Sequence, residues 1–208
     1  MLGQAVQDIS SPPAVWIQAS AVGYYGNSRD AVCDEGSPVG GNFLADVCQL
    51  WEADFHAVKY SGRKITMRLG SLVGREAQLI KNIEPIVKFF LGGAAGSGRQ
   101  YLSWVHIEDV VRSTDWFIEN DHTSGVYNIV APQAVTNSEL MRHLRRQFNR
   151  PWVPAAPEIV IKAVCRYIMA VDSSLVLEGN RSSAKKLQED GFVFNYPNLS
   201  SAFEEIYG

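Results

Sequence analysis

The stretch that decides the fold is AVWIQASAVGYYG, residues 14–26. It begins with the continuous apolar run Ala14–Ile17, which follows two prolines and is typical of a buried parallel strand. From Ser20 onward, small residues and two tyrosines predict a loop at the carboxyl end of this strand. Open α/β sheets bind their ligands at that end of their strands. We therefore expect a site over residues 20–26.

The elements after this strand alternate between helix and strand. Apolar residues at helical spacing predict a helix from Asn42 to about Tyr60, and Lys64–Leu69 reads as a second strand, followed by a loop to Gly74. A strand-helix-strand order favours a right-handed crossover and hence a parallel α/β sheet. The stripe of the first helix comprises Phe43, Val47, Leu50 or Trp51, Phe55 and Val58.

Further helices and strands are expected downstream. Periodicity indicates helices near residues 79–91, 107–119, 158–170, 184–190 and 199–206, strands near 101–104 and 125–130, and a short amphipathic helix at the start of the chain. Thr136 and Glu139 form a capping-box pattern ahead of Leu140 and Leu144, which predicts a helix start there. Prolines at 151, 154 and 157 then interrupt the chain. We expect one domain over residues 1–150 and a small, mostly helical lobe over 151–208.

The composition narrows the function classes. The chain has 208 residues, 46% of them hydrophobic and 20% charged, with a net charge of −3, as in a globular protein without general attraction to nucleic acid. No apolar run reaches the ~20 residues that cross a bilayer, so no membrane association is expected. The cysteines and histidines lack disulfide-framework or metal-ligand spacing, so we expect no metal and a reducing cytoplasm; they are Cys33, Cys48, Cys165, His56, His106, His122 and His143.

Two segments could carry chemistry on their residues alone. Ser20, Tyr24 and Tyr25 place a hydroxyl and two phenols where a carbonyl or alcohol substrate would be bound. The alternative is a small-residue turn whose aromatic rings pack on the next helix. The glycine-rich segment 92–98 has a helix before it and a strand after it, the reverse of a phosphate-binding loop. We expect it to be a mobile loop beside a substrate cleft.

Four segments resemble, in type and order, the YfcH-like epimerase branch of the extended short-chain dehydrogenase/reductases, within the NAD-dependent epimerase/dehydratase superfamily. They are SAVGYYG (20–26), FLADVCQLWE (43–52), RLGSLVG (68–74) and YLSWVHIEDVV (101–111). The segment 185–206 resembles the small C-terminal domain of the same proteins. The resemblance implies a Rossmann-like doubly wound parallel sheet, and an NADP(H)-dependent oxidoreductase or epimerase acting on a small carbonyl or sugar-nucleotide substrate.

The resemblance also implies roles for residues near the first strand. The family's catalytic serine matches Ser20, with Ala21 as the alternative register. The family's Tyr-x-x-x-Lys pair falls on Phe43 and Val47, which cannot exchange a proton or supply a positive charge. We therefore expect Ser20 and Tyr25 as catalytic residues, with Tyr24 as the alternative acid or a substrate contact.

Cofactor and substrate contacts follow from the same resemblance. The nicotinamide end of the cofactor is expected at Ala19, Ser20, Arg68, Leu69, Gly70 and Leu72. For residues 68–74 the alternative is a tight exit from the strand, in which the glycines are needed for packing. Trp104 and His106 are expected near the substrate. For His106 and Asp109 we prefer a structural role to a catalytic one: His106 would orient the backbone, and Asp109 would support a helix start.

The cofactor's pyrophosphate has no expected site in this chain. A strand, a glycine-rich turn and a helix would hold it, and the resemblance implies that this N-terminal third of a family-length protein is absent here. We expect weak cofactor binding and an open sheet edge covered by another chain, a rearranged segment or a second copy. The competing hypothesis is a catalytically silent binding or regulatory module on the same fold.

Overall fold

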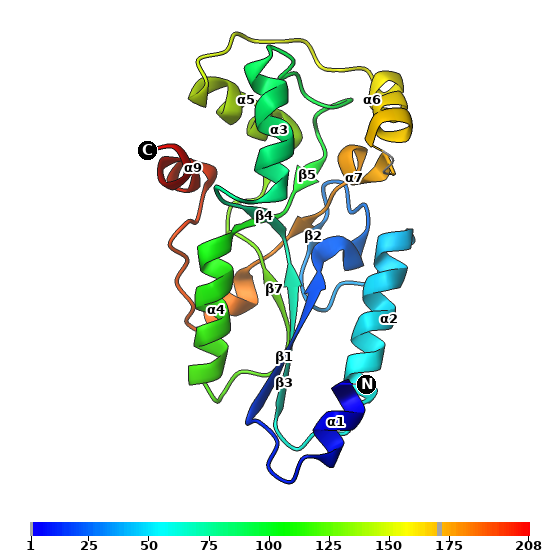
Figure 1. The fold of residues 1–208 in the computed structure, drawn as a ribbon, viewed down its shortest axis with the longest axis vertical. Helices are drawn as coiled ribbons and strands as arrows, with labels where there is room; N and C mark the ends of the chain where they lie inside the picture. Colours follow the sequence, from blue (N-terminus) through cyan, green and yellow to red (C-terminus); the bar gives the residue numbers. More distant parts are fainter. Residues whose placement is uncertain (1, 170–171) are drawn as a thin grey trace.

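The computed structural model describes residues 2–169 and 172–208, and its centre is a parallel three-stranded sheet (Figure 1). The strand order is β1-β3-β7, with β1 at Val15–Ala21, β3 at Arg63–Leu69 and β7 at Gly125–Ile129. All pairs are parallel. The expected α/β class with a parallel sheet is confirmed.

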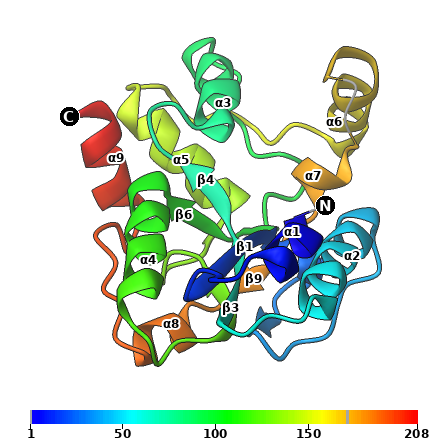
Figure 2. The ribbon, with the colours of Figure 1, turned by 60° about the horizontal axis from the view of Figure 1, so that its bottom comes forward.

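Helices cover both faces of this sheet (Figure 2). On one face, α2 (Phe43–Ala57) brings Phe55 edge-on against Trp16 of β1, with ring centroids 5.1 Å apart. On the other, α4 (Ile107–Glu119) packs Phe117 against Tyr127 of β7 at 4.8 Å. The central strand is buried over residues 65–68, that is, on both of its faces, as expected for a parallel strand covered by helices on either side.

The remaining elements extend the carboxyl end of the sheet. Strand β4 (Ser71–Val73) pairs in parallel with β6 (Trp104–His106), and β5 (Tyr101–Leu102) pairs antiparallel with β8 (Val135–Thr136). Helices α3 (Gln78–Lys88), α5 (Asn137–Gln147) and α9 (Leu199–Tyr207) surround a second core cluster there. The other elements are α1 (Leu2–Asp8), η1 (Val22–Tyr25), β2 (Val32–Cys33), α6 (Glu158–Val164), η2 (Cys165–Met169), α7 (Ser174–Leu177), β9 (Arg181–Ser182) and α8 (Lys185–Glu189).

The C-terminal segment contributes to both core clusters. Leu187 and Phe192 pack with the sheet residues, while Leu199 and Phe203 pack with α3 and α5. Residues 151–208 thus share their apolar contacts with the part of the chain before them. The proposed domain boundary at 150/151 stays a prediction.

Several expected boundaries differ from the structure. Strand β1 continues to Ala21, so Ser20 lies within the strand rather than in the loop, and β4 occupies part of the expected loop to Gly74. The pair β2–β9 was not expected, because two-residue strands are too short to show periodicity. The helix predicted to reach residue 170 is α6 followed by a π-helical turn to Met169; residue 170 lies outside the described residues.

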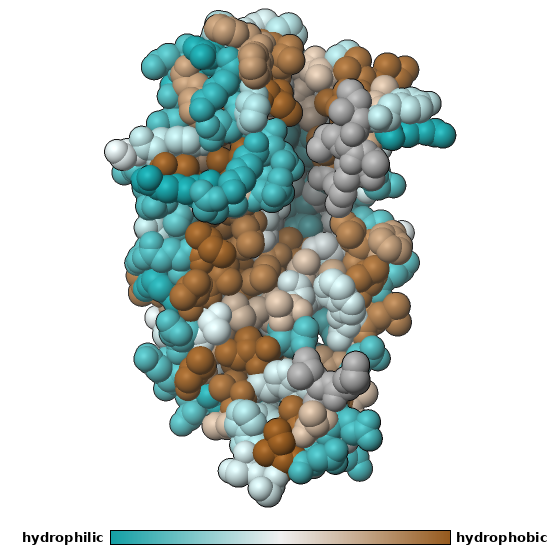
Figure 3. Space-filling view, viewed as in Figure 1, coloured by the Kyte–Doolittle hydropathy of each residue, from teal (hydrophilic) through white to brown (hydrophobic). Residues whose placement is uncertain are grey.

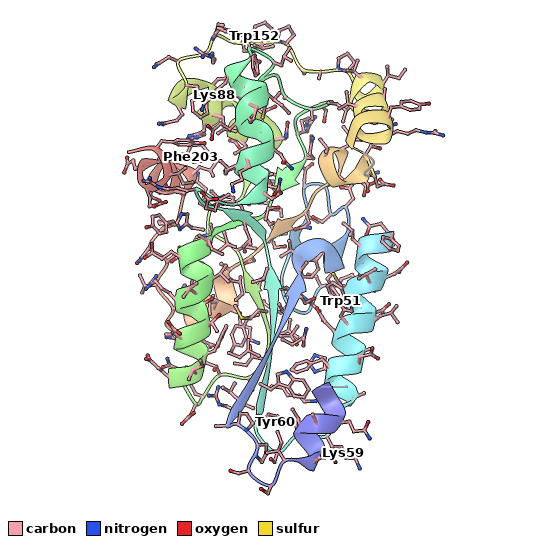
Figure 4. All side chains as sticks on the ribbon, viewed as in Figure 1. Trp51, Lys59, Tyr60, Lys88, Trp152 and Phe203 are labelled. Atoms are coloured by element: carbon pink, nitrogen blue, oxygen red, sulfur yellow. The ribbon has the colours of Figure 1, made fainter. Side chains whose placement is uncertain are left out.

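The predicted apolar stripe of α2 was largely wrong. Phe43, Leu50 and Trp51 are exposed at 77%, 66% and 55%, and Trp51 is labelled in Figure 4. Of the predicted stripe, Phe55 is buried as expected. The other residues of the buried face are Ala45, Cys48 and Glu52. Small residues and a buried carboxylate face the sheet because α2 lies over polar side chains of β1 and β3, described below.

One long edge of the sheet is open. Strand β1 pairs only with β3 among the described residues. Figure 3 shows hydrophobic residues gathered on the visible face over the sheet and α4. Val111 and Ile118 of α4 are more than half exposed. No described helix combines the length and apolar character that a membrane crossing requires.

Candidate functional site

A cleft opens at the carboxyl ends of β1 and β3. It has a volume of about 290 Å³. Its floor is built from small or apolar residues at the ends of these strands, namely Ala21, Val22, Gly23, Leu69 and Gly70. This is the expected position for a binding site in an open α/β sheet.

Gly70 lets the chain pass from β3 to β4 at this floor. A Cβ atom built there would lie 2.9 Å from the carbonyl oxygen of Ser103, so only glycine fits without displacing backbone. The Gly70 amide donates to Ile129 O at 3.0 Å, and the Ser71 amide donates to Ser103 O at 2.8 Å. Close packing against Ser103 is therefore enough to require glycine at position 70. This agrees with the alternative interpretation of the segment as a tight strand exit.

The rim of the cleft joins α2 to the C-terminal segment. Asn42 caps α2, its Oδ1 accepting from the Ala45 amide at 3.0 Å. The Asn42 Nδ2 donates to Glu178 Oε2 at 3.3 Å. Tyr101, Leu102 and Ser103 of the β5–β6 segment close the opposite side, and Ser174 and Gly179 complete the lining.

Ser20 and Ala21 lie on opposite sides of β1. Successive residues of a strand alternate between its faces, so only one of the two can face the cleft. Ala21 lines it, whereas Ser20 is 5% exposed and its Oγ donates to Glu52 Oε1 at 2.7 Å. In this structure Ala21, with a methyl group and not a hydroxyl, is therefore the residue at the cleft; the catalytic role expected for Ser20 stays a prediction.

Ser20 belongs instead to a polar row that crosses the sheet. It pairs in register with Arg68 of β3, which pairs with Asn128 of β7. Arg68 forms two hydrogen bonds to Glu52 of α2, from Nε to Oε1 at 2.9 Å and from Nη2 to Oε2 at 2.7 Å. This bidentate ion pair is almost fully buried, with side-chain exposures of 4% and 8%.

Tyr25 is part of the same buried network. Its Oη donates to Asn128 Oδ1 at 2.7 Å and accepts from Arg68 Nη1 at 2.9 Å. Burial raises the pKa of Tyr25 to about 12, in spite of the nearby Arg68 cation, which acts to lower it. The phenol is 4% exposed, so in this structure it stays protonated at neutral pH and does not reach the cleft.

The buried Arg68 cation is held by Tyr24 as well as by Glu52 and Tyr25. The Arg68 guanidinium stacks over the Tyr24 ring at 3.4 Å. Burial by itself would lower the pKa of Arg68, but its hydrogen bonds to Glu52 and the interactions with Tyr25 raise it above its ordinary value. Tyr24 therefore contacts a structural cation, and it is not among the residues that line the cleft. We name Ser20, Tyr25, Glu52, Arg68 and Asn128 the buried polar network.

The start of α2 gives the cleft no proton-transfer group. Leu44 lines the cleft, while Phe43 points into solvent. Val47, on the next turn, is likewise outside the lining. Leu44, the residue of this helix start that faces the cleft, cannot exchange a proton either.

Trp104 and His106 do not reach the cleft either. Trp104 is fully buried and its Nε1 donates to Gln133 O at 2.9 Å. His106 is 2% exposed, caps α4 by accepting from the Glu108 amide, and lies 3.2 Å from Glu205. Neither side chain is accessible to a ligand in this structure, and the expected place of Trp104 and His106 near the substrate stays a prediction.

Asp109 and the glycine-rich segment also have structural contacts. Asp109 accepts from the amides of Asn195 and Tyr196, both at 2.9 Å, and so ties α4 to the C-terminal segment. In the glycine-rich segment, Ala95 bridges to Ala156. Two of its residues line a separate hollow beside α5 rather than the cleft, which corrects our expectation; they are Ala94 and Ser97.

Of the residues expected to contact a cofactor, the structure brings two to the cleft, Leu69 and Gly70. Ala19 is exposed and lines a different hollow at the open edge with Trp16 and Trp51. Leu72 packs against the core cluster of the sheet. The sequence reasoning missed Glu52, Asn128 and Glu178; of these, only Glu52 stood in a segment that carried the resemblance.

Comparison with known proteins places the chain in a family. It is 31% identical over 209 residues to epimerase family protein SDR39U1 of Mus musculus, covering 99% of this chain and 70% of the mouse protein. The chain belongs to the epimerase family. It is 36% identical over 188 residues to epimerase family protein ML0860 of Mycobacterium leprae, which covers 90% of the chain but 60% of that relative. This member therefore spans well under the full length of that relative.

Structure and domain comparisons agree with this membership. The crystal structure of human epimerase family protein SDR39U1 with NADPH matches with a TM-score of 0.90 and 29% identity, over 99% of this chain and 69% of the human chain. Residues 156–206 match the model of a domain of unknown function, DUF1731. The C-terminal segment that supplies Glu178 to the cleft thus lies within that domain.

Proposed function

We propose that this epimerase family member forms the nicotinamide and substrate side of an NADP(H)-dependent oxidoreductase or epimerase-like site. The observation on which this proposal rests is the cleft at the carboxyl ends of β1 and β3, whose floor is formed by Ala21, Leu69 and Gly70. Support comes from the similarity to a human family protein whose structure contains NADPH. The substrate is a small carbonyl or sugar-nucleotide compound.

The residues of the floor suit a flat ring. Ala21 and Gly70 project no bulky side chain, so backbone and ring can approach closely. NADP(H), when bound, supplies or accepts a hydride. Asn42 and Ser71 would position polar groups at the rim, and Leu44 would exclude water from one side.

The phosphates of the cofactor have no comparable cradle in the described residues. At the cleft, β1 enters a 3₁₀ turn and β3 passes directly into β4, so neither strand reaches a helix N-terminus through a glycine-rich turn. Since nicotinamide cofactors depend on such phosphate contacts, we expect the 208-residue chain to bind NADPH weakly and to turn over little substrate.

NADPH fluorescence titration tests this proposal. We expect saturation only at millimolar concentration, and its loss in Ala21→Phe, which fills the floor. Ala163→Phe, at an exposed position of α6, is the matched control and should bind as the parent chain does. Micromolar affinity would refute weak binding, and equal affinity of all three proteins would refute the cleft as the site.

A catalytically silent binding or regulatory module is the second candidate. The observation that favours it is the pair Ala21 and Leu44, which flank the cleft where proton transfer would take place. A family-length protein should then show no cofactor-dependent turnover of carbonyl or sugar-nucleotide compounds. Turnover that is lost in Tyr25→Phe or Ser20→Ala, with the fold intact, would favour the enzyme.

Two features bear on the partner and the cellular compartment of the protein. We propose that the open edge of β1 is covered by another copy or another chain. Cys33, Cys48 and Cys165 are free and buried, which suits a reducing cytoplasm.

A further inference from the structure

We propose that the cleft selects against anionic groups and that Glu178 is the residue responsible. The part of the substrate that enters the cleft is then a neutral polyhydroxylated or a cationic group, and not a phosphate or carboxylate. This inference rests on the proposed function only in taking the cleft as the substrate site.

The charges around the cleft are one-sided. Glu178 is the charged residue of its lining, which contains no lysine, arginine or histidine among the described residues. The nearby Arg68 is already paired with Glu52 in the buried polar network. Arg181, over the Tyr101 ring at 5.1 Å, is exposed and outside the lining. A phosphate in the cleft would therefore meet a carboxylate without a partner cation.

Glu178 is held in place by a residue that is itself fixed. Asn42 uses its carbonyl oxygen to cap α2 and its amide to bond Glu178 Oε2. Because the cap sets the Asn42 side chain, the carboxylate is oriented before any ligand arrives. No described residue donates to Glu178 Oε1, which leaves that oxygen to accept from a hydroxyl or ammonium group of a ligand.

The other polar groups of the lining are neutral. Ser71, Ser174 and Tyr101 carry hydroxyls at the cleft, and each can both donate and accept. Asn180 and Ser103 are committed to the protein, through Asn180 Nδ2 to Val22 O at 2.9 Å and Ser103 Oγ to Asn180 O at 2.8 Å. One carboxylate acceptor with several hydroxyls is a set that matches a sugar-like polyol.

Ligand-observed NMR on the 208-residue chain tests the proposal with three sugars of the same ring: glucose, glucosamine and glucose 6-phosphate. We expect glucosamine to bind at least as tightly as glucose, and glucose 6-phosphate at least tenfold more weakly. In Glu178→Gln the three dissociation constants should come within about threefold of one another. Glu204→Gln, an exposed carboxylate on α9, should retain the discrimination of the parent chain.

Three results would overturn the proposal: glucose 6-phosphate binding as tightly as glucose, discrimination unchanged in Glu178→Gln, or no binding by any of the sugars. Glu178→Ala repeats the test if the glutamine variant melts early. The NADPH titration separates the two proposals, since charge discrimination without any NADPH binding would refute the proposed function and support the role of Glu178.

Discussion

At the scale of single residues, Arg68 connects the three central strands to α2. It touches Glu52, Tyr25 and Tyr24, and each of these contacts replaces water that the guanidinium lost on burial. Buried ion pairs add little net stability when complete, but removing one partner leaves an uncompensated charge.

Arg68→Met should therefore lower the free energy of unfolding by about 3–5 kcal/mol, measured by urea denaturation. The double variant Arg68→Met/Glu52→Leu should recover much of this loss, because no buried charge remains. As a control, Arg75→Met removes the ion pair between Arg75 and Glu205, whose side chains are 60% and 36% exposed respectively. It should lower the free energy of unfolding by less than about 1 kcal/mol. A double variant no more stable than the single one would contradict the explanation.

Tyr25 predicts a loss of stability at alkaline pH. Its pKa is about 12 in the folded chain, against about 10 when unfolded, so the folded state holds the proton more tightly. The resulting stability is fully present below pH 10 and is lost as the pH rises towards 12. Two pKa units correspond to roughly 2–3 kcal/mol.

Urea unfolding at pH 9, 10 and 11 checks this. The parent chain should lose stability more steeply with pH than Tyr25→Phe, in which the remaining tyrosines still titrate. The phenylalanine variant should also be about 1–3 kcal/mol less stable at pH 7, since Arg68 Nη1 and Asn128 Oδ1 each lose their hydrogen bond to the phenol. Parallel pH profiles would contradict the role assigned to burial.

At the scale of elements, the start of α5 is a helix cap that the local sequence predicts and the structure contains. The Thr136 Oγ accepts from the Glu139 amide at 3.3 Å, and Glu139 Oε2 accepts from the Thr136 amide at 2.8 Å. The capping box expected from the sequence is confirmed. Its effect is confined to four residues, which is why the sequence reveals it.

Thr136→Ala should destabilise the protein by about 1 kcal/mol, measured as a lower midpoint of urea unfolding. Thr136→Ser keeps the hydroxyl and should recover most of the loss. If serine were as damaging as alanine, packing of the threonine methyl group rather than capping would be the cause.

Helix α2 shows the opposite case, in which the local signal misleads. Its aromatic and aliphatic residues suggested the buried stripe, but Leu50 and Trp51 are exposed while Glu52 is buried. A carboxylate is seldom buried unless it is paired. Only the position of Arg68 on β3, 16 residues further on, makes Glu52 an inward-facing residue.

At the scale of the whole molecule, the open edge of β1 and the exposed apolar residues beside it govern solution behaviour. Edge strands with unpaired backbone groups pair readily with other chains, and exposed apolar patches mark contact surfaces. Val111 of α4 is 55% exposed, and Figure 3 shows hydrophobic residues gathered over the sheet and α4.

We expect the chain to associate with increasing concentration, as measured by size-exclusion chromatography with light scattering. Val111→Lys should shift the equilibrium towards monomer, because it places a charge on the exposed apolar surface of α4. Glu119→Lys, at an exposed position of the same helix, should not. A monodisperse monomer at all concentrations would contradict an edge that needs cover.

The sequence by itself determined the longer strands and helices and the family, because hydrophobic period, capping and motif order are carried by neighbouring residues. The tertiary structure alone decided which residue of each motif faces the cleft. Side chains alternate across a strand, so a shift of one residue exchanges the cleft for the core. That alternation puts Ala21 at the site and Ser20 beside Glu52. The packing of the C-terminal segment brings Glu178 to Asn42 from 136 residues away, a contact that no local pattern encodes.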